Sequence, residues 1–131
     1  MKKAGMLNKD INEVVALMGH TDTLMICDAG LPIPEGVRRI DLAIKPGLPG
    51  FLETTEAVAN ELKVDCILIA EEANARSPQI VAGLKSIFPG VEVQFVPHAE
   101  MKERSHGARA IIRTGEFTPY ANVILVSGVV F

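Results

Sequence analysis

Hydrophobic residues near the start of the chain recur with the period of a helix, and a continuous apolar run follows them. Four apolar residues fall on one helical face: Ile11, Val14, Val15 and Met18. Their spacing predicts an amphipathic helix with Asn8 as its N-cap. We expect this helix to end at Gly19, which can take the left-handed conformation that closes a helix. The run at residues 23–27 predicts a short strand, although apolar content alone does not separate a buried strand from a buried helix.

The rest of the chain repeats this change between strand-like and helix-like patterns. Further strands are predicted at residues 39–44, 65–70, 91–96 and 108–113, and in the tail 120–131 apart from a break at Ser127-Gly128. Further helices are predicted at residues 51–62, from Ser77-Pro78 onward, and at 99–105. Strands that alternate with helices are typical of α/β domains. We therefore expect an α/β fold: a single layered domain over residues 1–131, with a mostly parallel sheet flanked by helices.

Composition and charge narrow the classes of partner. The 131 residues are 48% hydrophobic, enough for the core of one domain, and the net charge is −3. A slightly acidic chain with 5% aromatic residues and no Trp is not typical of nucleic-acid-binding proteins. No apolar run approaches the ~20 residues of a membrane helix. Cys27 and Cys66 lie in apolar runs, so we expect buried free thiols in a reducing cytoplasm.

Motifs for metals and nucleotides are missing from the sequence. The three histidines show no H-x-x-x-H or H-E-x-x-H spacing, and no C-x-x-C pair occurs. The chain also has no G-x-S-x-G elbow, no Walker loop and no Rossmann fingerprint. We therefore expect neither a metal nor a cofactor, and the candidate chemistry is left to His, Asp, Tyr and Asn side chains.

Three titratable residues lie next to predicted strands. His20 precedes the strand at 23–27, Asp28 follows it, and His98 follows the strand at 91–96. Ligands in α/β sheets usually bind beyond the carboxyl ends of strands. Each residue also has a purely structural interpretation: His20 at the end of a helix dipole, Asp28 as a turn residue, and His98 as a helix cap. His106 lies in a polar stretch and is interpreted as a surface loop residue.

A polar segment near the C-terminus adds a phenol and a carboxamide. Pro119 favours an extended conformation before it, and continued extension would place Tyr120 and Asn122 on one side and Ala121 on the other. Such a surface suits a sugar, because a ring packs on its C–H face while an amide binds its hydroxyls. The alternative is an edge strand whose polar residues face water. Nearby Arg113 and Glu116 are expected to pair with each other or to hold the loop.

Several sequence blocks resemble the ribose pyranase and fucose mutarotase family, and the resemblance runs from end to end. The resemblance begins with Lys2-Lys3, Gly5 and Leu7-Asn8. The further blocks are Gly19-His20-Thr21-Asp22, Asp28-Ala29-Gly30-Leu31-Pro32-Ile33-Pro34, Ile40-Asp41-Leu42, Ile112-Arg113-Thr114-Gly115-Glu116, Pro119-Tyr120-Ala121-Asn122 and Gly128-Val129 to Phe131. The middle of the chain is less diagnostic, although Ala70-Glu71-Glu72 and His98-Ala99-Glu100 also match. His106 matches no family motif.

The resemblance implies an enzyme that interconverts the pyranose and furanose forms of D-ribose, ahead of a kinase that needs the furanose. It implies His20 as proton donor, with substrate contacts from Asp28, His98, Tyr120, Asn122 and the backbone of Ala121. It further implies a cytoplasmic homodecamer with sites at subunit interfaces. The alternatives are a mutarotase for another sugar, such as fucose, or a non-catalytic sugar-binding protein.

Chemistry and the C-terminus are compatible with this resemblance. Sugar ring opening needs only proton transfers, which an imidazole with a reference pKa of ~6.5 can perform at neutral pH. The sequence ends in the apolar Val129-Val130-Phe131, although chain ends are usually polar and frayed. This segment is interpreted either as packed against another subunit or as an edge strand of the monomer.

Overall fold

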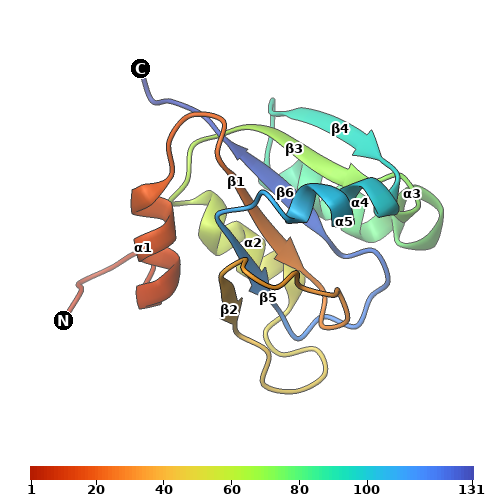
Figure 1. Cartoon of the computed structure of the whole chain (residues 1–131), viewed down its shortest axis with the longest axis horizontal. Helices are drawn as coiled ribbons and strands as arrows, with labels where there is room; N and C mark the ends of the chain where they lie inside the picture. Colours follow the sequence, from red (N-terminus) through yellow and green to blue (C-terminus); the bar gives the residue numbers. More distant parts are fainter.

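A six-stranded sheet forms the centre of the computed structural model, which describes residues 1–131 (Figure 1). The strands are β1 (Thr23–Cys27), β2 (Arg39–Asp41), β3 (Val64–Ala70), β4 (Glu92–Val96), β5 (Ala110–Arg113) and β6 (Val123–Ser127). The helices are α1 (Lys9–Leu17), α2 (Phe51–Ala59), α3 (Ala73–Arg76), α4 (Pro78–Ile87) and α5 (His98–Ser105).

The sheet is mostly parallel, in the order β2-β5-β1-β6-β3-β4. β1 and β2 both run parallel to β5, and β3 runs parallel to β4. Only β6 is antiparallel, to β1 on one side and β3 on the other. The fold is therefore of the α/β class, as the sequence predicts. The strand-like tail becomes β6, which joins the two parallel halves of the sheet.

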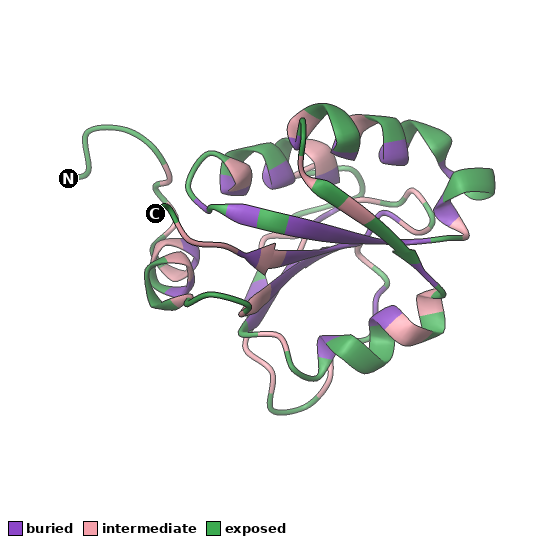
Figure 2. Cartoon of the chain, turned by 90° about the horizontal axis from the view of Figure 1, so that it is seen from above, coloured by how far each residue is buried: buried purple, intermediate pink, exposed green.

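Helices cover both faces of the sheet, and each face buries its own hydrophobic cluster (Figure 2). The larger cluster joins α1, α2, α4 and one set of strand residues, including Leu24, Ile26, Ile67 and Ile69. The smaller cluster contains the alternate strand residues, including Met25, Cys27 and Leu68, together with Met101 of α5. Because successive strand side chains point to opposite faces, these short apolar runs fill both clusters.

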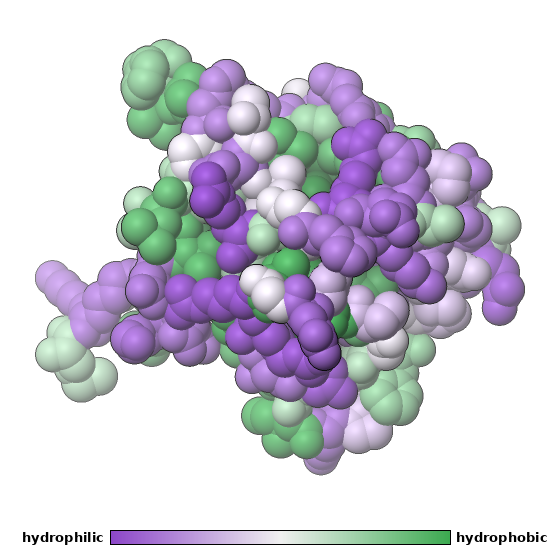
Figure 3. Space-filling view, in the orientation of Figure 1, coloured by the Kyte–Doolittle hydropathy of each residue, from purple (hydrophilic) through white to green (hydrophobic).

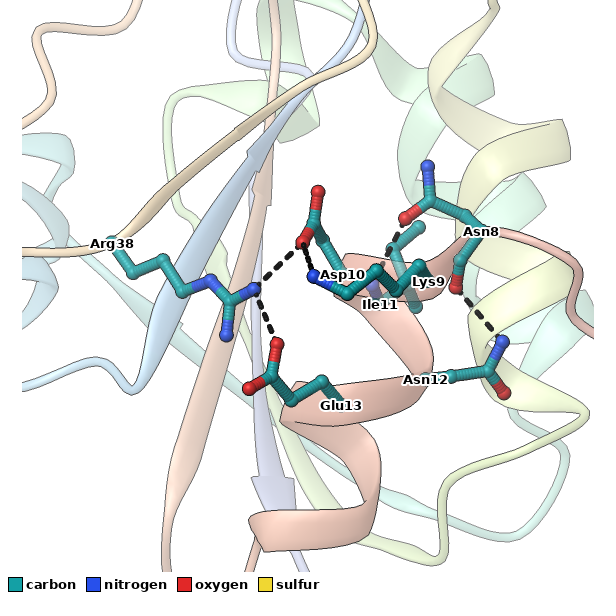
Figure 4. A network of polar contacts seen from close by, with 7 residues as sticks. All are labelled: Asn8, Lys9, Asp10, Ile11, Asn12, Glu13 and Arg38. Atoms are coloured by element: carbon teal, nitrogen blue, oxygen red, sulfur yellow. Dashed lines mark hydrogen bonds and ion pairs between the residues drawn. The ribbon is translucent and has the colours of Figure 1, made fainter.

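The start of α1 is fixed by its cap and by a cation from the loop before β2. Asn8 Oδ1 accepts a hydrogen bond from the Ile11 N–H at 3.0 Å, which confirms the predicted N-cap. Arg38 donates to Asp10 and to Glu13, each at 2.9 Å (Figure 4). These two contacts join the first turns of α1 to the start of β2.

The end of α1 differs from the prediction. The helix ends at Leu17, and Gly19 does not take the left-handed conformation. The residue with a positive φ is instead Thr21, at 70°. A β-branched residue is rarely found there, so the turn that carries His20 is held in place by its surroundings. Those surroundings include the Thr21 N–H donating to the Ser127 carbonyl at 2.9 Å.

Other elements end a few residues before their predicted bounds. The strand expected at 39–44 ends at Asp41, because Asp41 Oδ1 accepts from the Ala43 N–H and a turn follows at 44–48. The helix expected at 51–62 ends at Ala59. α3 was not predicted, since a single helical turn has no periodicity to detect.

Candidate functional site

Asp28 lies directly after β1, at the carboxyl end of the strand, and Asn122 holds it there. The Asn122 side chain accepts from the Asp28 N–H and donates to Asp28 Oδ2, both at 3.0 Å. Asp28 Oδ1 accepts from the Gly30 N–H at 2.9 Å. The turn interpretation of Asp28 is therefore correct, and Asn122 in addition orients its carboxylate across the sheet.

The segment that contains Tyr120 is a turn and not an extended strand. Tyr120 has a φ of 60°, and its carbonyl accepts from the Asn122 N–H at 2.8 Å. The Ala121 N–H donates back to the Thr118 carbonyl at 3.4 Å, and Ala121 is buried. The prediction that Tyr120 and Asn122 share one side of an extended segment is wrong, and so is the alternative of an edge strand facing water, because Asn122 is 0% exposed.

His98 opens α5 at the carboxyl end of β4, beside this turn. Its ring meets the Tyr120 ring edge to face, with 5.1 Å between the ring centroids. The His98 N–H donates to both carboxylate oxygens of Glu72, at 3.0 and 3.2 Å. The N-cap of α5 is Pro97, and no side chain caps it. The helix-cap interpretation of His98 is therefore wrong.

The His98 imidazole has a free ring nitrogen, and its surroundings favour the neutral form of the ring. Its Nε2 is buried and has no hydrogen-bond partner in the protein. Burial lowers the pKa of His98, and Lys102 adds to this effect, while Glu72 and Asp28 oppose it. A buried polar atom without a partner is unfavourable unless something binds it, so this nitrogen marks a place for a polar ligand.

A cavity of about 350 Å³ adjoins Asp28, between the loop after β1 and the connection from β5 to β6. It is lined by Asp28, Ala29, Gly30, Arg113, Glu116, Phe117, Thr118 and Pro119. Arg113 donates to Asp41 and to the Ala29 carbonyl, each at 3.1 Å. Glu116 accepts from the Phe51 N–H. Arg113 and Glu116 therefore hold the loops and do not pair with each other.

His20 lies at the opposite end of β1 from Asp28. The five residues of β1 alone span about 16 Å. One ribose molecule could not touch both side chains of one chain. The structure thus brings together Asp28, His98, Tyr120, Ala121 and Asn122, but leaves His20 apart from them. His20 also lies three residues beyond the end of α1, so the interpretation that places it in the helix dipole is not supported.

The surroundings of His20 are open and combine charged residues with the apolar C-terminal segment. Its side chain is 58% exposed, and its Nε2 lies 3.6 Å from Asp65 Oδ2. It lines a hollow of about 560 Å³ together with Lys63, Gly128 and the C-terminal residues 129–131. Val130 and Phe131 are 86% and 100% exposed. Figure 3 shows hydrophobic atoms that project from the molecule where Figure 1 marks the C-terminus. The last strand, β6, ends at Ser127, so the tail is not an edge strand of the monomer.

The other candidates have structural surroundings. His106 is exposed and its Nδ1 contacts the carbonyls of Lys102 and Glu103 at the end of α5, as expected of a surface residue. Cys27 and Cys66 are buried and free, and burial raises the pKa of Cys27 to about 12. No group of three His, Cys, Asp or Glu residues could hold a metal ion. No helix has the length and apolar character needed to cross a bilayer.

Two acidic residues lie next to the candidate histidines and are not among the predicted site residues. Glu72 fixes the backbone of His98, and Asp65 faces His20. Glu72 stands in one of the blocks that resemble the family, but only its tertiary contact shows that it binds the backbone of His98. Asp65 left a signal: it is a lone charge at the start of an apolar run, a place where a hydrophobic residue would extend the strand.

Comparison with known proteins gives consistent matches over the whole chain. The model of the RbsD / FucU transport protein family matches residues 1–130. A D-ribose pyranase of Laribacter hongkongensis is 53% identical over 131 residues, which is all of both chains. A D-ribose pyranase of Geobacillus kaustophilus is 50% identical over all of this chain and 96% of its own.

Solved structures agree with the sequence matches. The structure of Bacillus subtilis RbsD complexed with D-ribose superposes with a TM-score of 0.97 and 46% identity, over all of both chains. A fucose mutarotase of Streptococcus pneumoniae, in complex with L-fucose, has a TM-score of 0.78 over 95% of both chains. Its identity of 24% shows a shared fold and nothing more about this chain.

Proposed function

The chain belongs to the RbsD / FucU family, and on this premise we propose that it interconverts the pyranose and furanose forms of D-ribose. The observation that carries the proposal is the polar cluster at the carboxyl ends of β1 and β4. It contains a carboxylate, Asp28, oriented by Asn122, and the buried, unpartnered Nε2 of His98, whose charge state Asp28 influences. The full-length similarity to proteins named D-ribose pyranase supports the choice of sugar. The furanose product would supply a kinase that phosphorylates ribose in that form.

The reaction needs proton transfers and no carrier. The anomeric hydroxyl gives up its proton, the bond between the anomeric carbon and the ring oxygen breaks, and the ring oxygen takes a proton. The resulting open-chain aldehyde closes again when a different hydroxyl attacks it, which changes the ring size. General acid–base catalysis contributes about 10²–10⁴-fold to such a step.

The residues of the cluster have distinct roles in this proposal. Asp28 accepts hydrogen bonds from sugar hydroxyls, because Asn122 fixes its orientation and its two oxygens keep free lone pairs. His98 binds a hydroxyl through its free Nε2. Tyr120 and the backbone of Ala121 complete the contacts from the turn beside them.

His20 is the proton donor, and it comes from a second subunit. Within one chain β1 separates it from Asp28, so a shared site requires two copies. The exposed apolar residues Val130 and Phe131 beside His20 support contact with another subunit, because water would otherwise surround them. We propose a cytoplasmic homodecamer in which each site lies at a subunit interface.

The test is saturation-transfer NMR on equilibrated ribose, which measures exchange between ring forms directly. Wild-type protein should accelerate the exchange, and light scattering should show a particle many times the 14.1 kDa chain. His20→Gln should bind ribose and unfold near the wild-type temperature, yet exchange about 10²–10⁴-fold more slowly.

Three outcomes would contradict parts of this proposal. Binding without accelerated exchange would make the protein a sugar-binding module. Preferential exchange of another sugar, such as fucose, would make it a mutarotase of different specificity. Near-normal exchange by His20→Gln would remove His20 from the reaction and favour His98.

A further inference from the structure

We propose that Asp65 is a positioning residue that orients the His20 imidazole for proton transfer. This inference rests on the proposed role of His20 as proton donor. The Asp65 carboxylate oxygen Oδ2 lies 3.6 Å from His20 Nε2, within the range of an ion pair. Exposed ion pairs contribute little to stability, so the value of this contact lies in orientation.

Asp65 is aimed at His20 by an irregularity in β3. Val64 is paired with Ser127 of β6, whereas Cys66 is paired with the adjacent Val126. Two steps along β3 thus match one step along β6, and Asp65 is the extra residue of a β-bulge. The bulge also moves Val64 to the larger hydrophobic cluster while Cys66 faces the smaller one. Bulges often turn a side chain toward a functional site.

Two neighbours keep the carboxylate in this direction. Gly128 leaves the space that it occupies, because a Cβ at position 128 would overlap the Asp65 carboxylate. The Gly128 N–H donates to the Lys63 carbonyl at 2.9 Å, which fixes the chain beside the bulge. Lys63 Nζ lies 3.7 Å from Asp65 Oδ1, so the other oxygen remains toward His20.

The turn that carries His20 is fixed to the same strand end. The Thr21 N–H donates to the Ser127 carbonyl at 2.9 Å, and the Ser127 N–H donates to the Asp22 carbonyl at 2.8 Å. Asp22 accepts from the Gly19 N–H and from Arg109. His20 is thus held from both sides against the end of β6, where the Asp65 bulge lies.

A carboxylate beside one ring nitrogen keeps a proton on that nitrogen and selects the tautomer and ring orientation. When the ring carries a proton on both nitrogens, the other nitrogen can give its proton to the sugar oxygen in the neighbouring subunit's site. The charged groups around His20 are Asp65 and Lys63 at β3, Glu61 after α2, and Asp22 on its own turn. Asp65 is the only acidic group within 4.0 Å of a ring nitrogen.

The experiment compares Asp65→Asn with Asp10→Asn, a control that is also exposed and ion-paired but lies on α1. Asp65→Asn should lower kcat for ribose exchange by about 10- to 100-fold with little change in KM, as for carboxylates that orient a histidine. Asp10→Asn should leave both constants unchanged. The imidazole ¹⁵N chemical shifts of His20 should move in Asp65→Asn and stay unchanged in Asp10→Asn.

A double variant separates this inference from the proposed function. In the His20→Gln background, Asp65→Asn should cause no further loss, because its effect passes through His20. A wild-type kcat for Asp65→Asn, or an equal loss with and without His20, would overturn the positioning role. Full exchange by His20→Gln alone would instead overturn the role of His20. Unshifted His20 ring signals in Asp65→Asn would overturn the contact itself, whatever the activity.

Discussion

Asn122 and Asp28, 94 positions apart in the sequence, exchange two hydrogen bonds of 3.0 Å at the carboxyl end of the sheet. One bond runs from the Asp28 backbone to the Asn122 side chain, and the other runs back from the Asn122 amide to the Asp28 carboxylate. Because Asn122 is completely buried, the pair has a single geometry. The antiparallel β6 therefore serves to bring Asn122 to the end of β1.

Substitution of either partner should weaken ribose binding. Asp28→Asn replaces a carboxylate, which accepts strong hydrogen bonds, by a neutral amide. We expect the affinity for ribose to fall about 10- to 100-fold while the fold stays intact. Asn122→Ala should also lower the free energy of unfolding by about 1–3 kcal/mol, because the Asp28 N–H loses its partner. Calorimetric titration with ribose and thermal unfolding measure the two effects. Unchanged affinity in both variants would exclude this pair from the site.

Glu116 should stabilise the protein in a pH-dependent manner. Burial acts to raise the pKa of Glu116, but hydrogen bonds from the Phe51 N–H and from Thr118 outweigh it and lower the pKa. Since the folded pKa is depressed, the stabilisation is present above about pH 4.5, the unfolded value, and is lost as pH falls through the folded pKa.

The variant Glu116→Gln should lose about 1–3 kcal/mol at neutral pH, because its amide meets the donors of Phe51 or Thr118. Glu116→Gln should also lack the loss of stability that protonation of Glu116 causes in the wild-type protein at acidic pH. Denaturant unfolding at neutral and acidic pH measures both quantities. Glu103→Gln, at an exposed position on α5, is the matched control and should behave as wild type.

His98 should destabilise the protein in weak acid. Burial lowers the pKa of His98 below 6.5, so between the two pKa values the unfolded chain binds more protons than the native protein. The free energy of unfolding should therefore fall as the pH falls below about 6.5, until the folded pKa is passed. Unfolding curves between pH 7.5 and pH 5, in about half-unit steps, follow this loss.

Two variants identify the group responsible. His98→Gln should remove this part of the pH dependence, whereas His106→Gln retains His98 and should keep it. A wild-type dependence in His98→Gln would assign the acid sensitivity to other groups. In the proposed site, the same neutral state suits His98 to bind a sugar hydroxyl at neutral pH, and His20 is the proposed proton donor.

Sequence patterns predicted the elements well where burial alone determines them. The strand at 23–27 was predicted with its observed bounds, since all but its first residue are buried. Asn8 caps α1 as expected, because capping is a local interaction. The order of strands and helices follows from the same periodicities, and it was enough for the α/β class.

Features that depend on distant residues were not predictable in this way. The conformations of Thr21 and Tyr120 are imposed by contacts with Ser127 and by the turn before Asn122, against the preferences of their own side chains. The partners of the candidate histidines, Glu72 and Asp65, lie 26 and 45 positions away in sequence. The separation of His20 from Asp28 follows from β1, which lies between them. Only the folded structure shows that the chain does not bring the two side chains together in another way.

Two impaired variants should regain activity when they assemble together. In the proposed site His20 and Asp28 come from different subunits, so His20→Gln chains can supply Asp28 and Asp28→Asn chains can supply His20. If the chains mix randomly, roughly a quarter of the sites contain both native residues, because each is contributed independently by a neighbouring subunit. Exchange should be measured at ribose concentrations below KM, where both parent variants are slow.

The mixed sample is prepared by unfolding and refolding the two variants together, and the control is the same two proteins refolded separately and then combined. Restored exchange only in the co-refolded sample would support a site shared between subunits. A co-refolded sample with only the average activity of its parents would contradict that arrangement. In that case one chain would have to carry the whole reaction, and since β1 keeps its His20 away from its Asp28, the proton donor would have to be His98.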